Sequence, residues 1–298
     1  MTMPRILVTG ATGQVGFELR RALAPLADIA AVTRSEMNLT DSISVAAVLD
    51  RYQPDVIVNP AAYTAVDKAE SEPDLARTVN AVAPGVMSEW AAAHQALIVH
   101  YSTDYVFEGG GNRPYLENDV VGPQSVYGAT KLDGEEAVRS ATSRHLILRT
   151  SWVVGAHGSN FLKTILRLAR ERSQLRIVSD QFGAPTSAAL IADVTAQLIA
   201  RYFARREQFE FGTYHLTAAG ETNWCEYARH VVALAEAGGI ELKLRAADIQ
   251  AIATHEYPLP AKRPGNSRLD CSKLTTTFGI CLPDWRKGVD YVFEQLHH

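Results

Sequence analysis

The sequence has few cysteines, no long hydrophobic run and no strong excess of charge, and each absence excludes a class of protein. Only Cys225, Cys271 and Cys281 occur, and none forms a CxxC pair, which fits a reducing compartment better than a disulfide framework. No stretch reaches the roughly 18 consecutive apolar residues of a membrane helix, and the N-terminus lacks a signal-peptide pattern. The net charge of -4 provides no basic surface for nucleic acid. We therefore expect a cytoplasmic protein that binds neither membranes nor nucleic acid.

What is present is the composition of an ordinary globular protein, with 47% hydrophobic residues in a chain of 298. In the first half, short apolar runs alternate with segments of helical periodicity, which is typical of parallel strands buried on both faces. The pattern predicts an α/β fold with a doubly wound parallel sheet, a Rossmann fold. The expected strands are 6–9, 29–32, 56–59, 97–101 and 145–150, and the expected helices begin near Val15 or cover 70–94 and 126–141.

The second half is more mixed and indicates a smaller lobe. Helical patterns cover 161–172, 188–203 and 224–237, a strand is expected at 213–216, and a proline-rich stretch covers 257–268. We expect residues 1–150 to form the dinucleotide-binding domain and residues 151–298 to form mainly a substrate-binding lobe. Some of the later segments are expected to return to the sheet.

A glycine-rich turn joins the first expected strand to the first helix. Gly10, Gly13 and Gly16 have the spacing GxxGxxG, with Thr12, Gln14 and Val15 in the same turn. The first glycine permits the sharp turn, the second lets a pyrophosphate approach the backbone, and the third lets the helix pack on the strand. The free N–H groups of the helix N-terminus then attract phosphate. This placement favours dinucleotide binding over a plain tight turn.

The end of the second expected strand bears on the choice of cofactor. An NAD site usually has an acidic residue there, whereas an arginine accommodates the 2′-phosphate of NADP. This chain has Arg34, and the first acid is Glu36. The pattern favours NADPH, unless Arg34 is only a solvated loop charge.

Tyr127 and Lys131 form a YxxxK pair on an expected helix, where residues four apart share a face. A nearby ammonium stabilises a phenolate, so we expect Lys131 to lower the pKa of Tyr127. A tyrosine placed in this way can give a proton to the alkoxide that forms when hydride reaches a ketone. Thr103 follows the fourth expected strand, where ligands of doubly wound sheets lie, and can bond the same carbonyl. Taken alone, the pair is better explained as a surface lysine beside a packed tyrosine, and the strand end as a β-turn with Asp104 in an Asx-type conformation.

Together these motifs resemble the dTDP-4-dehydrorhamnose reductases, which are extended short-chain dehydrogenases/reductases. The resemblance covers almost the whole chain, because further segments match the family. They are 59–70, 100–107, 126–135, 149–153, 180–186 and 263–269. It implies reduction of the C4 ketone of dTDP-4-dehydro-L-rhamnose to dTDP-L-rhamnose by NADPH, with NADH also accepted.

The resemblance also implies roles for individual residues. Tyr127 would donate the proton, Lys131 would orient the cofactor ribose, and Thr103 would hold the carbonyl. The sugar would be contacted by Asp104, Tyr105 and Trp152. The remaining cofactor contacts implied are Asn38 and Leu39 near the adenine, and Ala61, Ala62, Tyr63 and Thr64 beside the nicotinamide.

Two departures from the family pattern bear on cofactor and assembly. Asn38 stands where the family commonly has Asp, which leaves the choice between NADPH and NADH open. Some members dimerise around Mg²⁺ held by carboxylates, but the matching helix here begins Ser187-Ala188-Ala189-Leu190, without Glu. We therefore expect no metal site, while a homodimer of another kind stays open.

One further residue and two other functions complete the hypotheses. Arg263, in the proline-rich segment, is a candidate partner for the substrate pyrophosphate, because guanidinium presents a fork of donors; the alternative is a surface ion pair. The chain could instead reduce a sibling dTDP-4-keto-6-deoxysugar. It could also be a non-catalytic NADP-binding regulatory subunit, although it retains Thr103, Tyr127 and Lys131.

Overall fold

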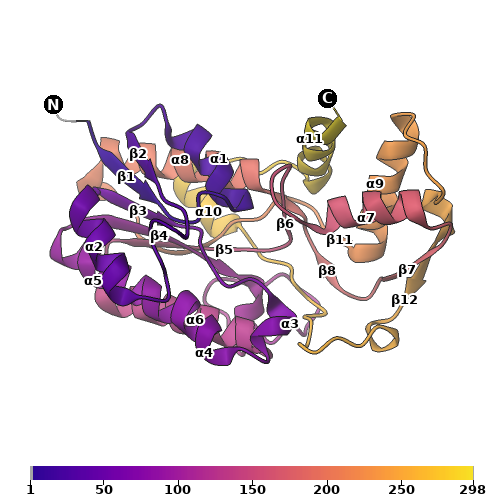
Figure 1. The fold of residues 1–298 in the computed structure, drawn as a ribbon, viewed down its shortest axis with the longest axis horizontal. Coiled ribbons are helices and arrows are strands. Elements are labelled where there is room, and N and C mark those ends of the chain that lie inside the picture. Colours follow the sequence, from indigo (N-terminus) through magenta and orange to yellow (C-terminus); the bar gives the residue numbers. More distant parts are fainter. Residues whose placement is uncertain (1–2, 298) are drawn as a thin grey trace.

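A six-stranded parallel sheet forms the centre of the protein, of which the computed structural model describes residues 3–297 (Figure 1). The strand order is β10-β5-β4-β3-β1-β2. The strands are β1 (Arg5–Val8), β2 (Asp28–Ala31), β3 (Val56–Asn59), β4 (Leu97–Thr103), β5 (His145–Thr150) and β10 (Gly212–His215). This order confirms the predicted doubly wound sheet. Successive strands are added on one side of β1 up to β2 and on the other side from β3 onward, while all strands stay parallel. Ligands of such folds bind beside this switch point between β1 and β3.

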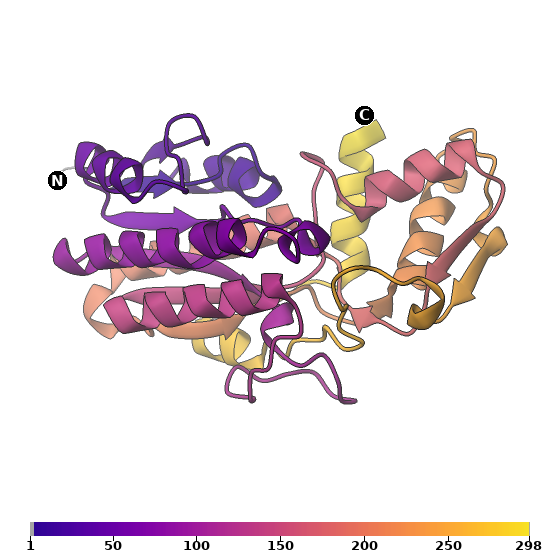
Figure 2. The ribbon, with the colours of Figure 1, turned by 60° about the horizontal axis from the view of Figure 1, so that its bottom comes forward.

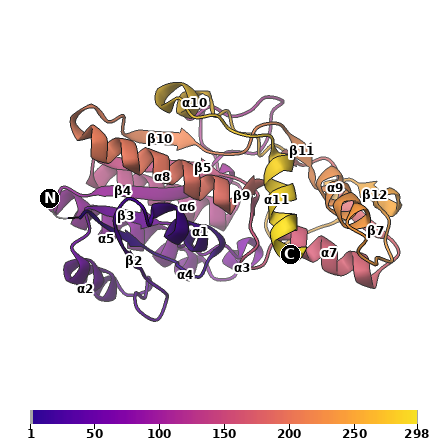
Figure 3. The ribbon, with the colours of Figure 1, turned by 90° about the horizontal axis from the view of Figure 1, so that it is seen from above.

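Helices cover both faces of the sheet because neighbouring strand residues point to opposite sides. Ile6 and Val8 pack toward α1 (Gln14–Leu23), α8 (Ala188–Ala204) and α10 (Ser272–Phe278). Leu7 packs toward α2 (Ser42–Tyr52), α5 (Ala83–Ala93) and α6 (Val126–Ala141). Figure 3 shows α1 and α8 side by side on their face. Thus α8, α10 and β10 belong to the sheet layer although they come late in the chain.

The expected helix over 70–94 is divided in the structure. It is preceded by α3 (Val66–Ala69) and consists of α4 (Pro73–Arg77), a π-helical turn (Thr78–Val82) and α5. Pro84 explains the division, because it has no N–H to donate to the carbonyl of Asn80, four residues earlier. The wider turn leaves this carbonyl close to α6, where a Cβ on Gly134 would overlap it.

The second lobe has a core of its own beside the sheet, with α11 (Trp285–His297) between the two (Figure 2). It contains α7 (Phe161–Glu171) and α9 (Trp224–Ala237). Its strands form short pairs: β7 (Leu175–Val178) with β12 (Ile249–Ile252), and β8 (Phe182–Gly183) with β11 (Thr222–Asn223). A third pair, β6 (Val153–Val154) with β9 (Thr186–Ser187), lies where the chain passes between lobe and sheet. Within residues 3–297, no helix is long and apolar enough to cross a membrane.

Candidate active site

The glycine turn lies between β1 and α1, at the switch point of the sheet. Gly10 has a φ of +56°, and a Cβ built there would lie 3.0 Å from the Cβ of Ala61. A Cβ on Gly16 would overlap the carbonyl oxygen of Gly10. Gly13 precedes α1 and provides no side-chain cap, so the first N–H groups of the helix have no side-chain acceptor. The turn therefore brings bare backbone donors close to a groove.

The groove beside this turn has a volume of about 750 Å³. Every residue that the sequence assigned to the cofactor lines it, although the segments come from different parts of the chain. These residues are Gly10, Thr12, Gly13, Gln14, Val15, Gly16, Arg34, Asn38, Leu39, Ala61, Ala62, Tyr63, Thr64, Tyr127 and Lys131. The structure thus brings the whole predicted set together around one cavity.

At one end of the groove, after β2, Arg34 is exposed and has no hydrogen-bond or ion-pair partner within residues 3–297. Glu36, the nearest acid, turns back to Thr33 and accepts hydrogen bonds from its N–H and hydroxyl at 2.8 Å each. These bonds lower the pKa of Glu36. Asn38 is similarly engaged and accepts from the N–H of Thr40 at 3.1 Å. An unpaired cation at this end of the groove suits the 2′-phosphate of NADP better than the 2′-hydroxyl of NAD, which is a hydrogen-bond donor.

The loop after β3 forms the opposite wall of the groove, and Asn80 holds it in place. Its side-chain oxygen accepts from the N–H of Tyr63 at 2.8 Å, and its Nδ2 donates to the carbonyl of Tyr63 and the hydroxyl of Thr130. Asn80 is buried in the π-helical turn, a kind of irregularity that often accompanies functional sites. The sequence hypotheses did not include Asn80, because periodicity gives no indication of a π turn.

Tyr127 lies in the first turn of α6, which Ser125 caps by accepting from the N–H of Gly128 at 3.2 Å. Its ring meets the ring of Tyr105 edge-on, with centroids 5.4 Å apart. Desolvation of its hydroxyl raises the pKa of Tyr127 to about 12, and a hydrogen bond with Thr103 partly offsets this rise. The pKa of Tyr127 is therefore raised and not lowered as expected, because burial dominates its environment.

Lys131 is buried on α6, and its Nζ lies 3.2 Å from Nε2 of His100 on β4. Burial disfavours the ammonium and lowers the pKa of Lys131 to about 8, although the charge of Glu135 opposes this shift. His100 is fully buried, and desolvation followed by the charge of Lys131 lowers its pKa well below the usual value. The imidazole is therefore neutral at physiological pH.

Thr103 and Asp104 are buried at the end of β4, between the groove and a second cavity. The Thr103 hydroxyl donates to Oδ1 of Asp104 at 3.0 Å and accepts from the N–H of Tyr105 at 3.2 Å. Burial raises the pKa of Asp104 to about 6, although hydrogen bonds from Ser267 and Thr103 oppose the rise. Thr103 and Asp104 are not among the residues that line these two cavities, whereas Tyr105 lines the second.

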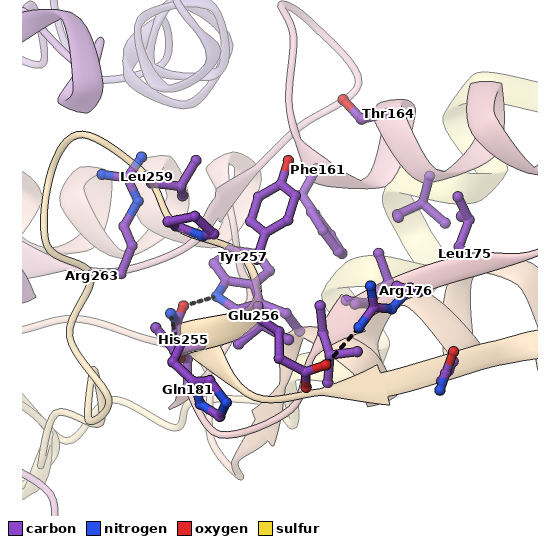
Figure 4. A pocket seen from close by; sticks show the side chains of 18 of the residues that line it. Phe161, Thr164, Leu175, Arg176, Gln181, His255, Glu256, Tyr257, Leu259 and Arg263 are labelled. Carbon is purple, nitrogen blue, oxygen red and sulfur yellow. Dashed lines mark hydrogen bonds and ion pairs between the residues drawn. The ribbon is translucent and has the colours of Figure 1, made fainter.

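The second cavity lies in the smaller lobe and has a volume of about 1230 Å³. Tyr105, Trp152 and Arg263, the remaining predicted substrate residues, all line it. Its wall also includes Phe161 and Thr164 from α7, Leu175 and Arg176 from β7, and Tyr257 and Leu259 from the loop after β12 (Figure 4). Arg176 pairs with Glu256 at 2.6 Å. The cavity thus combines aromatic surface with cationic groups.

Trp152 and Arg263 are each held by a neighbour at this cavity. The Trp152 ring stacks on Trp224 with centroids 3.8 Å apart, and its backbone has a φ of +48°. Arg263 pairs through Nη2 with Asp67 at 2.6 Å, while its buried Nη1 has no hydrogen-bond partner among residues 3–297. Arg263 thus forms an ion pair, one of the two predicted alternatives, and the residue also lines the cavity.

Asn59 and His100 also bear on the site, and the sequence hypotheses assigned them no role. Asn59 ends β3, and its Nδ2 lies 3.1 Å from Nδ1 of His100. A pattern was available: Asn59 and His100 each follow an apolar residue, Ile57 or Ile98, by two positions, so they point to the same face of the sheet. Among the residues that the structure describes, no group of three or more His, Cys, Asp and Glu side chains could hold a metal.

A parallel Rossmann sheet, a glycine turn and a Tyr–Lys pair beside a second cavity define an extended short-chain dehydrogenase/reductase. The family model described as RmlD substrate binding domain matches residues 4–298. The chain is 48% identical to a dTDP-4-dehydrorhamnose reductase of Shigella flexneri over 295 residues, 98% of this chain and 97% of that protein. The chain belongs to this family, as its motifs indicate.

Solved structures agree with this assignment. Those of dTDP-4-dehydrorhamnose reductases from Clostridium acetobutylicum and Bacillus anthracis both have a TM-score of 0.89, with 34% and 31% sequence identity. Each comparison covers 99% of this chain and 100% of the other. The Bacillus anthracis protein was solved in complex with NADP.

Proposed function

We propose that this protein uses NADPH to reduce the C4 ketone of dTDP-4-dehydro-L-rhamnose, giving dTDP-L-rhamnose in the last step of that nucleotide-sugar pathway. One observation carries the proposal: Tyr127 lines the glycine-turn groove, while its ring neighbour Tyr105 lines the larger cavity. A dinucleotide in the groove and a nucleotide sugar in the cavity would meet at this tyrosine pair. Family membership supports the same reaction.

The groove suits a dinucleotide in shape and chemistry. The space beside Gly10 and Gly16 admits no side chain, and the first turn of α1 offers backbone donors to a pyrophosphate. Arg34 would hold the 2′-phosphate, and its lack of an ion-pair partner within residues 3–297 supports NADPH as the preferred form, with NADH also accepted. Lys131 would hold the nicotinamide ribose. When bound, the cofactor supplies the hydride for the ketone carbon.

Tyr127 would supply the proton. A phenol with a pKa of about 12 keeps its proton near neutral pH and releases it only to a stronger base. The alkoxide formed at the sugar C4 is such a base, so proton transfer follows or accompanies reduction. The Thr103 hydroxyl, which donates to Asp104 in the structure, would turn to donate to the same oxygen and hold it in place.

The larger cavity would hold the nucleotide sugar. Arg263 has one buried donor without a partner, and that donor would meet the pyrophosphate. Trp152 lines the cavity beside Tyr105, so its indole would contact the sugar. The base would lie deeper in the lobe, near the rings of Phe161 and Tyr257. We further assign the protein to the cytoplasm, since all its cysteines are free thiols.

The test is NADPH oxidation with dTDP-4-dehydro-L-rhamnose, compared for the wild type, Tyr127→Phe and Tyr291→Phe. Tyr291 is exposed on α11 and serves as the matched control. We expect Tyr127→Phe to lower kcat by about 100- to 10,000-fold, the usual contribution of a general acid. NADPH binding, measured by quenching of protein fluorescence, should remain. Near-normal turnover of Tyr127→Phe would refute its role.

Two further measurements address the alternatives. NADPH oxidation with other dTDP-4-keto-6-deoxysugars is measured beside dTDP-4-dehydro-L-rhamnose, and a higher kcat/KM for one of them would favour the sibling reductase. A wild-type protein that binds NADPH but turns over neither this sugar nor a sibling ketone, with NADPH or NADH, would favour the regulatory function.

A further inference from the structure

A row of buried polar side chains crosses the sheet beneath Lys131. Asn59 on β3 and His100 on β4 are register partners, and Thr9 follows the end of the adjacent β1. Each lies two positions after a residue of the core that faces α6 (Leu7, Ile57 or Ile98), so all three side chains point toward that helix. Each is almost completely buried. Polar groups in such a position need partners, because burying an unpaired one is costly.

The row is continuous from the catalytic helix to the glycine turn. Lys131 Nζ lies 3.2 Å from His100 Nε2, and His100 Nδ1 lies 3.1 Å from the amide of Asn59. The other end of this amide lies 2.6 Å from the Thr9 hydroxyl, which accepts from the N–H of Ala61 at 3.3 Å. The last residue begins the loop that forms one wall of the cofactor groove.

The chemistry of Lys131 fixes the state of the row. An ammonium has only donors, so Nε2 of His100 must be the acceptor and the ring proton must reside on Nδ1. In the structure the Thr9 hydroxyl donates to Asn59 Oδ1, and Asn59 Nδ2 faces His100 Nδ1. The oxygen and nitrogen of an amide occupy interchangeable positions, so beside a charged Lys131 the amide takes the opposite orientation: its oxygen accepts from Nδ1–H of His100 and its nitrogen donates to Thr9. When Lys131 is uncharged, the amide orientation in the structure and the other ring tautomer satisfy the same atoms.

No other side chain takes the place of His100. The titratable and charged groups that bear on Lys131 are Tyr127 and Glu135 on α6, His100 on β4, and Arg149 on β5 behind Glu135. The Glu135 oxygens already accept from Arg149 at 2.8 and 2.7 Å and from Arg139 at 3.0 Å. Lys131 therefore has Nε2 of His100 as its hydrogen-bond acceptor within residues 3–297.

We propose that His100 is a positioning residue: through Nε2 it sets the place of Lys131 Nζ and helps it keep its proton, while Asn59 and Thr9 fix the imidazole. The role rests on the proposed reductase function, in which Lys131 holds the cofactor ribose beside Tyr127. It also links Lys131 to Ala61, so that two walls of the groove share one set of hydrogen bonds. His100 itself touches neither cofactor nor substrate.

Two amide variants separate this role from simple packing. In His100→Gln the amide can reach the position of Nε2 and accept from Lys131, whereas in His100→Asn it reaches only the position of Nδ1. Both are neutral and polar, and they differ by one methylene. Thermal unfolding of both variants controls for the loss of core packing. If His100 had a purely structural role, the activity of the variants would correlate with their Tm and not with the presence of an acceptor at the position of Nε2.

Three readouts are expected to respond. In the wild type, kcat/KM should fall as the pH rises through about 8, because Lys131 loses its proton there. His100→Asn removes the acceptor of the ammonium, so the fall of kcat/KM should occur about one pH unit lower. In His100→Gln, which keeps an acceptor, the fall should occur at the same pH as in the wild type. The Kd for NADPH at neutral pH, which needs no turnover, should rise about tenfold in the Asn variant only.

The proposal would be overturned if both variants fold and show the same alkaline fall of kcat/KM and the same Kd for NADPH. If neither variant folds, ¹⁵N NMR of the wild-type histidine ring decides: at neutral pH the proton of His100 must be on Nδ1, and a proton on Nε2 overturns the role. The tautomer and the NADPH Kd are independent of the substrate. A wild type inactive on the sugar would therefore contradict the proposed function and not these two measurements.

Discussion

Replacing Gly16 by alanine is expected to damage both the fold and the cofactor groove. The added Cβ would overlap the carbonyl oxygen of Gly10, which is backbone and cannot rotate away. To relieve the overlap, α1 must move off β1, although its buried Leu19 and Leu23 pack in the core with α8. Overpacking of this kind typically costs about 1–3 kcal/mol of unfolding free energy.

A second helical glycine provides the matched control. Gly85 lies in α5, and a Cβ there would lie 3.5 Å from the Cβ of Ala137, an ordinary contact. Gly→Ala in a helix gains about 1 kcal/mol from propensity alone, and this gain is common to both variants. The difference between Gly85→Ala and Gly16→Ala therefore isolates the overlap, about 1–3 kcal/mol.

Thermal unfolding and NADPH titration are the assays. At this chain length about 1 kcal/mol corresponds to about 2 °C, so Gly16→Ala should melt about 2–6 °C below Gly85→Ala. Because the first turn of α1 moves away from the pyrophosphate, the Kd for NADPH should rise at least about tenfold, while Gly85→Ala binds as the wild type does. Equal Tm and equal affinity would show that the turn relaxes freely and would refute the reasoning.

Two further substitutions test the anionic contacts. Arg34→Ala should raise the KM for NADPH about tenfold and leave that for NADH almost unchanged, since only NADPH carries the 2′-phosphate; a parallel change in both would exclude the assigned contact. Arg263→Ala should raise the KM for the sugar nucleotide much more than it lowers kcat, and more than Asp67→Ala does, which removes the ion-pair partner and the acceptor of the Ala261 N–H but keeps the guanidinium. An unchanged KM in Arg263→Ala would leave its donor without a function.

Much of the fold follows from local patterns. α6 and α9 begin and end at the expected residues, because their apolar periodicity is bounded by the N-caps Ser125 and Asn223. The strands of the sheet are short apolar runs, and parallel strands buried on both faces leave this signature. The cofactor set could be assembled from the sequence because its members lie in the glycine turn, after the second strand, or at positions that the family resemblance marks.

Other elements had no such local pattern. β7 and β12 pair across more than 70 residues, and each is a four-residue strand that only its partner makes recognisable. The π turn before α5 depends on how Pro84 and α6 share space, which periodicity does not contain. The pKa of Tyr127 was predicted in the wrong direction because sequence spacing shows which charges are near but not how much water is excluded.

The charge balance of the protein makes the placement of single cations decisive. With a net charge of -4, the overall field does not attract polyanionic ligands, so each anion must be held by local donors. Arg34 is exposed and adaptable, which suits a phosphate at the mouth of the groove. Arg263 is different: Asp67 fixes one side of its guanidinium, and the buried Nη1 has no hydrogen-bond partner within residues 3–297. An arginine already fixed in this way loses little side-chain entropy on binding, so Asp67 should improve affinity although it carries the same sign of charge as the ligand.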